Sequence, residues 1–211
     1  MNVKEIDNKK TALLFFDMLN VYFHGVAEQK KERLRPVVAN AVRLRDAAHK
    51  AAIPIFYAKA NHRSDGAAMN RVVTDTDMQL RPWANGECSP ALHAATEGSW
   101  EAEVIEEIKP GPEDYVIPKY RWNAFHQTYL DLALRARGID TVILSGGAID
   151  VGVASTAYAA RDMDYNLIIV RDACSNSFDE PVAIFMEKVF PRMARVRTTD
   201  QVLAMIAAHA R

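Results

Sequence analysis

Residues 141–173 constrain the fold of this chain more than any other segment. Two apolar segments, residues 141–145 and 167–170, flank a Gly-Gly pair and an alanine-rich stretch that suits a helix. Strand, turn, helix and strand in this order form a β-α-β unit. Strands so continuously apolar favour the middle of a parallel sheet that is covered on both faces. We therefore expect an α/β fold built around this unit.

The turn of this unit has features of a ligand site. Gly146 and Gly147 permit backbone angles and close approaches that a Cβ would prevent, and Asp150 is expected to cap the helix that follows. The first helical turn would then direct free N–H groups toward the carboxyl edge of the sheet, where open α/β sheets bind ligands. Gly152 lies in that turn and provides no side chain where one could reach the site.

The rest of the chain alternates strands with helices. Strands are predicted at residues 11–16, 53–58, 114–117 and 194–198, and helices at residues 34–52, 100–108, 128–137, 180–190 and 200–208. The charged residues 30–33 are expected to be a solvated approach to the helix 34–52, with Pro36 in its first turn. Six strands alternating with helices predict a doubly wound, Rossmann-like three-layer α-β-α sandwich with a mostly parallel sheet. The length suits one domain over residues 1–211.

Charge and composition argue against several classes of protein. The 26 basic and 27 acidic residues nearly cancel, so no charge pattern favours nucleic acid or an anionic membrane as a partner. No apolar segment is long enough to cross a bilayer, and we expect a soluble cytoplasmic protein. Cys88 and Cys174 lie far apart, without the spacing of a zinc site or a disulfide framework, although a single disulfide stays open.

Two predicted strands are followed by charged residues. A carboxylate at the end of a buried strand loses solvation unless it has a partner or a role, so Asp17, after the strand 11–16, is a candidate functional group. The alternative is a loop aspartate that accepts hydrogen bonds from nearby N–H groups. Lys119 follows the strand 114–117 and is a second candidate. The alternative is that Lys119 is simply an exposed lysine at a strand end.

A long irregular segment, residues 59–99, separates the second and third predicted strands. Segments of this length in compact domains are commonly functional walls, lids or partner-binding segments. Trp83 and Trp100 could wall a pocket, or could pack in the core or at an interface. The six histidines show no ligand spacing such as HxH or HExxH, so we expect no metal and no cofactor.

The motif SGGAIDVGVASTAYAARD resembles the nucleophile segment of the isochorismatase-like hydrolases. In that family a catalytic cysteine follows four residues after the alanine of a glycine-containing turn. Ala148 matches the alanine, and Gly152 matches the position of the cysteine. True isochorismatases, which cleave an enol ether and need no thiol, resemble this chain in having glycine there. The resemblance also implies a cis peptide between Gly147 and Ala148.

Two further motifs carry the same resemblance. Asp17 with Met18 and Asn20 is similar to the family's first strand end, and Lys119 is similar to the family's lysine at the third. The resemblance implies that both charged residues meet the Gly147–Gly152 turn at one site. The expected substrate-binding residues are Asn20, Tyr22, Trp83, Trp122, Asn123 and Phe125.

The resemblance implies a hydrolase of a small molecule that works without a covalent intermediate. Asp17 would donate or accept a proton, and Lys119 would position it and bind a carboxylate of the substrate. Backbone N–H groups of the turn would hold a developing oxyanion. For an enol ether, Asp17 would have to deliver its proton to carbon.

Two other functions stay open at this point. One is an amide or ureide hydrolase whose nucleophile has moved to Cys174 or Cys88, either of which would need an activating basic partner. The other is a non-catalytic binding protein on the same fold. Relatives are commonly dimers or tetramers, so we expect a homo-oligomer, with Tyr158, Met163 or the long segment as candidate contacts.

Overall fold

The computed structural model describes residues 5–68, 77, 95–176 and 178–208. Its centre is a six-stranded sheet in the order β3-β2-β1-β4-β5-β6, and every neighbouring pair of strands is parallel. The strands are β1 (Thr11–Phe16), β2 (Ile55–Ala60), β3 (Tyr115–Lys119), β4 (Thr141–Gly147), β5 (Asn166–Ser175) and β6 (Arg195–Arg197). The predicted doubly wound sheet is confirmed.

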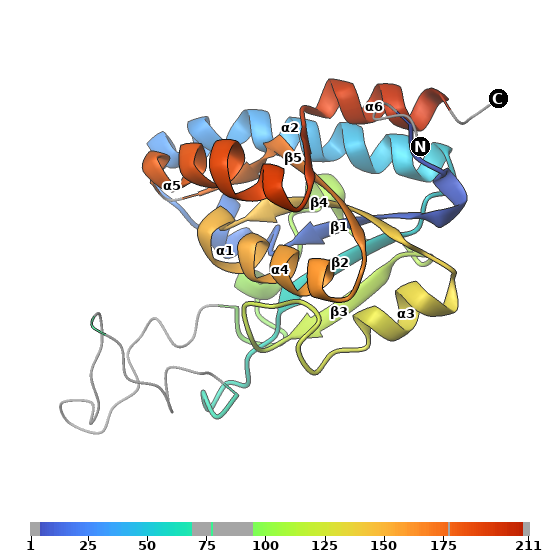
Figure 1. The fold of residues 1–211 in the computed structure, drawn as a ribbon. Helices are drawn as coiled ribbons and strands as arrows, with labels where there is room; N and C mark the ends of the chain where they lie inside the picture. The colour runs from blue at the N-terminus through green and yellow to red at the C-terminus, as the bar shows by residue number, and fades with distance from the viewer. Residues whose placement is uncertain (1–4, 69–76, 78–94, 177, 209–211) are drawn as a thin grey trace.

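Helices cover both faces of this sheet (Figure 1). The α-helices are α1 (Asn20–Phe23), α2 (Glu28–Lys50), α3 (Leu130–Ala136), α4 (Ala154–Asp162), α5 (Asp179–Ile184) and α6 (Thr199–Ala208). Shorter 3-10 and π-helical segments are η1 (Asn8–Lys10), η5 (Trp100–Ala102), η6 (Glu106–Ile108), η7 (Ile149–Val153), η8 (Phe185–Val189) and η9 (Phe190–Arg192). None of the described helices combines the length and the apolar character that crossing a bilayer requires.

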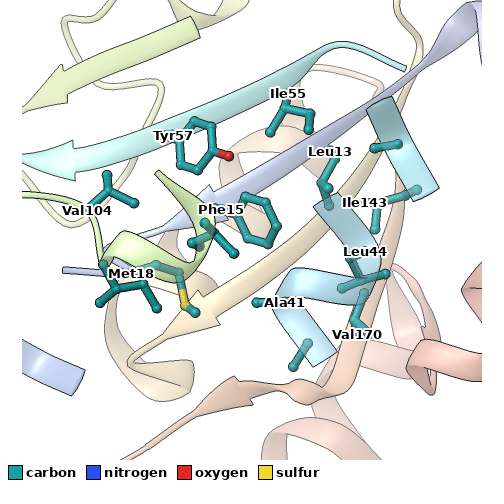
Figure 2. Close-up of a cluster of buried hydrophobic side chains, with 14 of the residues drawn as sticks. Leu13, Phe15, Met18, Ala41, Leu44, Ile55, Tyr57, Val104, Ile143 and Val170 are labelled. Atoms are coloured by element: carbon teal, nitrogen blue, oxygen red, sulfur yellow. The ribbon is translucent and has the colours of Figure 1, made fainter. Parts of the chain in front are cut away.

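Each face of the sheet has its own hydrophobic core. Successive side chains of a strand point to opposite faces, so Leu13 and Phe15 pack in the core under α2 and α6, while Phe16 packs in the core under α3 and α4. Figure 2 shows Leu13 and Phe15 of β1 in one cluster with Ala41 and Leu44 of α2. Ala41 and Leu44 therefore lie on the buried face of this helix.

The helix α2 begins earlier than predicted. It starts at Glu28, so the charged residues 30–33 are helical and Pro36 lies inside the helix rather than in its first turn. The residues before Leu34 are good helix formers, and Glu28 in the first turn suits the helix dipole. Pro36 is exposed, so the carbonyl that it leaves without a helical partner can bond water.

Two other predictions about helices were wrong. Residues 100–108 form two 3-10 turns, η5 and η6, because Val104 between them pairs with Leu19 as an isolated antiparallel bridge. Asp150 does not cap the helix after β4. The π-helical turn η7 has Ala148 at its N-cap without a side-chain cap, so Asp150 already lies inside the first turn.

Candidate active site

Asp17 and Lys119 form a buried ion pair at the carboxyl edge of the sheet. Lys119 Nζ lies 2.7 Å from Asp17 Oδ2, and the N–H of Ala60 donates to Asp17 Oδ1 at 2.8 Å. Asp17 is 8% exposed and Lys119 is 4% exposed. A buried charge is tolerated when it is paired and hydrogen-bonded, and removal of either partner leaves the other uncompensated. The ends of β1, β2 and β3 therefore hold one carboxylate and one ammonium in fixed positions.

The backbone of Asp17 adopts an uncommon conformation. Its φ is +47°, in the left-handed region that residues other than glycine rarely occupy. Its N–H donates to Ala58 O at 2.9 Å, and its carbonyl accepts from the N–H of Leu19 at 2.8 Å. Such conformations persist where the surrounding structure enforces them, and they cluster at functional sites.

The Gly-Gly turn at the end of β4 approaches β1 very closely. Gly146 has φ +120°, and a Cβ on it would lie 2.0 Å from the carbonyl oxygen of Phe16. Only glycine fits at this position, because a Cβ would clash with the backbone of Phe16, which cannot move aside as a side chain could. The following Gly147–Ala148 peptide is cis, as the family resemblance implied.

These groups surround one cavity of about 220 Å³. Asp17 and Lys119 line it together with Gly147, Ala148 and Gly152, so the three strand ends meet as expected. Ligand sites of open α/β sheets lie at this carboxyl edge, near the point where the strand order reverses, which here lies between β1 and β4.

Among the predicted substrate-binding residues, Tyr22 and Trp122 line this cavity. Asn20 does not, because its Nδ2 donates to the carbonyl of Trp100 at 2.9 Å. Asn123 also has a local role, since its Oδ1 accepts from the N–H of Phe125 at 2.8 Å.

The ring of Phe125 is buried in the core, where it stacks on Tyr165. It does not line the cavity, because it belongs to the packing between α3 and α4. Trp83 lies outside the described residues.

The space that a side chain at position 152 would need is already filled. A Cβ built on Gly152 would lie 2.0 Å from Cε1 and 2.3 Å from Cζ of Phe16. This ring is 1% exposed, and the ammonium of Lys119 lies 4.2 Å from its centroid, a cation-π contact. The ring of Phe16 therefore occupies the space beside Gly152 into which a side chain would extend.

Cys174 is a poor candidate nucleophile. Its thiol is buried at the end of β5, and burial raises its pKa to about 12. The reactive thiolate is therefore strongly disfavoured. Burial of this thiol, and its position outside the lining of the cavity, argue against the alternative in which the nucleophile has moved to Cys174, and Cys88 lies outside the described residues.

His62 follows β2 and contributes no charge at neutral pH. Burial, and then the neighbouring Lys119, lower the pKa of its imidazole below the usual value, so the neutral ring is favoured. In the described part of the chain, no three histidine, cysteine or acidic side chains gather in a way that could hold a metal ion.

Three further polar residues of the cavity were not predicted. Ser175 is the last residue of β5, and Asn176 follows it directly. They are polar residues at a strand end, the same signal that identified Asp17. Lys30 lines the cavity from the first turn of α2, and it was missed because residues 30–33 were interpreted as a solvated run.

The sequence and the structure both match known proteins. Residues 11–201 match the isochorismatase domain. An uncharacterized isochorismatase family protein, YwoC of Bacillus subtilis, is 35% identical over 98% of this chain and 99% of its own length. The ureidoacrylate amidohydrolase RutB of Acinetobacter baylyi is 30% identical over 79% of this chain and 71% of its own. N-carbamoylsarcosine amidase from Thermoplasma acidophilum superposes with a TM-score of 0.71 at 29% identity, covering 90% of this chain and 97% of that chain.

Proposed function

Because this chain belongs to the isochorismatase family of hydrolases, we propose that it cleaves a small carboxylate-bearing molecule with water, not a cysteine, as the nucleophile. The bond that is cleaved would be the C–O bond of an enol ether or a related bond. The observation that carries this proposal is the overlap between Phe16 and any side chain at position 152. A cavity that holds Asp17 and Lys119, but in which Phe16 fills the place of a side chain at position 152, favours direct hydrolysis.

In this mechanism Asp17 is the proton donor or acceptor. Its Oδ2 is held by Lys119 and its Oδ1 by the N–H of Ala60, so the carboxyl group has one orientation in the cavity. Positioning of an acid-base group in this way contributes strongly to catalysis. For an enol ether, Asp17 would deliver a proton to carbon, and water would add to the resulting oxocarbenium ion and return a proton to Asp17. The hemiketal would then collapse, breaking its C–O bond, to give a carbonyl product and an alcohol.

Lys119 and the turn after β4 would support this step. Lys119 holds Asp17 and is itself restrained above the ring of Phe16, so its role is to position the acid. The first N–H groups of a helix have no partner within the helix. Those at the start of η7, beside Gly147 and Ala148, would stabilise an oxyanion.

A second candidate is hydrolysis of a carboxamide or ureide. It is favoured by the likeness to a ureidoacrylate amidohydrolase and to N-carbamoylsarcosine amidase, each named for cleavage of a C–N bond. In this chain such a reaction would also have to proceed through water, since position 152 has no side chain.

A hydrolysis screen of isochorismate against carboxamides and ureides separates the two candidates. On whichever substrate is cleaved, Asp17→Asn should lower kcat/KM roughly 10²- to 10⁴-fold, the usual contribution of a positioned acid-base group. Asp46→Asn, an exposed aspartate paired with Arg45, is the matched control and should keep native activity. Undiminished turnover in Asp17→Asn would contradict the proposal.

A folding control accompanies this measurement. Asp17→Asn leaves Lys119 as an uncompensated buried charge, so this variant should also melt at a lower temperature. The double variant Asp17→Asn/Lys119→Met removes both charges and should recover part of the stability but none of the activity. Recovery of activity together with stability would assign Asp17 a structural role only.

A further inference from the structure

Among the described residues that line the active-site cavity, positive charge exceeds negative charge. Its charged lining residues among those described are Asp17, Lys119 and Lys30. Lys119 is already paired with Asp17 at 2.7 Å, so these two charges compensate each other. Lys30 remains as a second cation, so the part of the lining that the structure describes has a surplus of one positive charge.

Lys30 differs from the other cations around it. Lys31 pairs with Glu28, and Arg33 pairs with Asp179. In the described part of the chain, no carboxylate lies within ion-pair distance of Lys30, although its side chain is half-buried. A lysine in the first turn of a helix also lies at the unfavourable end of the helix dipole. Local electrostatics therefore do not explain this position, whereas an anionic ligand would.

The rest of the cavity wall is mainly apolar. Phe16, Phe23, Leu34 and Val151 contribute side chains that suit a compact apolar or planar body. A cavity of about 220 Å³ with an unpaired cation among its described residues matches a small molecule that bears a carboxylate on such a body.

We propose that Lys30 binds the carboxylate of the substrate, so that this site selects a small monoanion over its neutral amide. The inference rests on the proposed function, and it moves carboxylate binding from Lys119, where the sequence had suggested it, to Lys30. Lys119 is already paired with Asp17, whereas Lys30 has no carboxylate partner among the described residues.

Benzoate and benzamide test this inference, because they have the same planar body and differ in charge. Binding is followed by calorimetry, and no turnover is needed. The native protein should bind benzoate roughly tenfold more tightly than benzamide, as expected for one hydrogen bond to a charged group. Lys30→Met should abolish this preference while leaving benzamide binding unchanged, and Lys30→Arg should restore it.

Lys31→Met is the matched control, since Lys31 is the next residue of the same helix and is paired with Glu28. It should keep the native preference. A Lys30→Met variant that still prefers benzoate, or native protein that binds the two probes equally or binds neither, would overturn the assignment.

The outcome is distinguishable from failure of the proposed function. A protein that shows the Lys30-dependent preference but hydrolyses nothing in the screen would refute hydrolysis and leave the anion site in place. Asp17-dependent hydrolysis without any effect of Lys30→Met on KM would refute the anion site alone.

Discussion

The contact between Phe16 and Gly152 leaves no space for a side chain at position 152 unless the ring moves. Phe16 ends β1 directly before Asp17, and its ring lies where a side chain at position 152 would have to stand. The same ring lies under the ammonium of Lys119. A side chain at position 152 thus requires the ring of Phe16 to move or Phe16 to be replaced by a smaller residue.

A double-mutant cycle tests this coupling. Gly152→Ala should lower the free energy of unfolding by about 1–3 kcal/mol, the usual effect of overpacking a core, and Phe16→Val should lower it through the cavity that it leaves. The double variant should be more stable than the sum predicts, with a coupling free energy of about 0.5–3 kcal/mol. Urea unfolding provides the values.

Gly111→Ala is the control for this cycle, because a Cβ on Gly111 would make only an ordinary contact at 3.6 Å with Asp114 Oδ2. In one contrary outcome, Gly152→Ala lowers the free energy of unfolding no more than Gly111→Ala does; in another, the effects of Gly152→Ala and Phe16→Val simply add. Either result would contradict the proposed contact between Phe16 and position 152. Where it holds, Phe16→Val/Gly152→Cys is the variant with room for a thiol beside Asp17.

At the scale of elements, β5 positions the last helix as well as the cavity wall. Asp172 Oδ1 accepts from the N–H of Thr199 at 2.7 Å and from its hydroxyl at 2.9 Å, so the start of α6 is attached to the sheet. Thr198 and Gln201 add a reciprocal capping box at the same helix end. A single strand therefore fixes an element far from the cavity.

Loss of this attachment should affect stability and not catalysis. Asp172→Ala removes two hydrogen bonds to the start of α6 and should lower the free energy of unfolding by about 1–3 kcal/mol. Steady-state kinetics well below the melting temperature should stay native. Asp162→Ala, at an exposed position in α4, should change the stability by less than about 0.5 kcal/mol. Equal effects of the two substitutions would refute the role of Asp172.

At the scale of the whole molecule, the strand order places the site. The order β3-β2-β1-β4-β5-β6 reverses between β1 and β4, so Asp17 and Gly147 flank the crevice that opens there. Lys119 ends β3, which lies two strands away from β1. Its side chain extends past the end of β2 to pair with Asp17 at the end of β1. Burial in the core also favours the neutral thiol of Cys174, so the ionisation of this thiol is coupled to unfolding.

This coupling predicts an alkaline effect on stability. The folded protein raises the pKa of Cys174 from 9.0 to about 12, so folding favours the neutral thiol. The resulting contribution is fully present below about pH 9 and is lost as the pH rises toward 12. Between pH 9 and pH 10.5, the free energy of unfolding should fall more steeply in the native protein than in Cys174→Ala, by roughly 1 kcal/mol per pH unit. Parallel pH profiles would contradict the prediction.

The sequence by itself determined the layers of this fold and three of its strand ends. Continuous apolar segments at residues 11–16 and 141–145 require burial on both faces, and Asp17 and the Gly-Gly turn follow them directly. Lys119 follows the predicted strand 114–117 after Pro118. These signals are local, because they depend on the desolvation of a strand and on the geometry of a turn.

Only the tertiary structure decided which side chains share the cavity. Asn20, Asn123 and Phe125 fit the family pattern in sequence, yet their hydrogen bonds and packing place them outside the cavity. Lys30 and the ring of Phe16 entered the site because α2 and β1 pack against elements far away in the sequence. Contacts of this kind depend on how helices and strands are packed together, which no local pattern encodes.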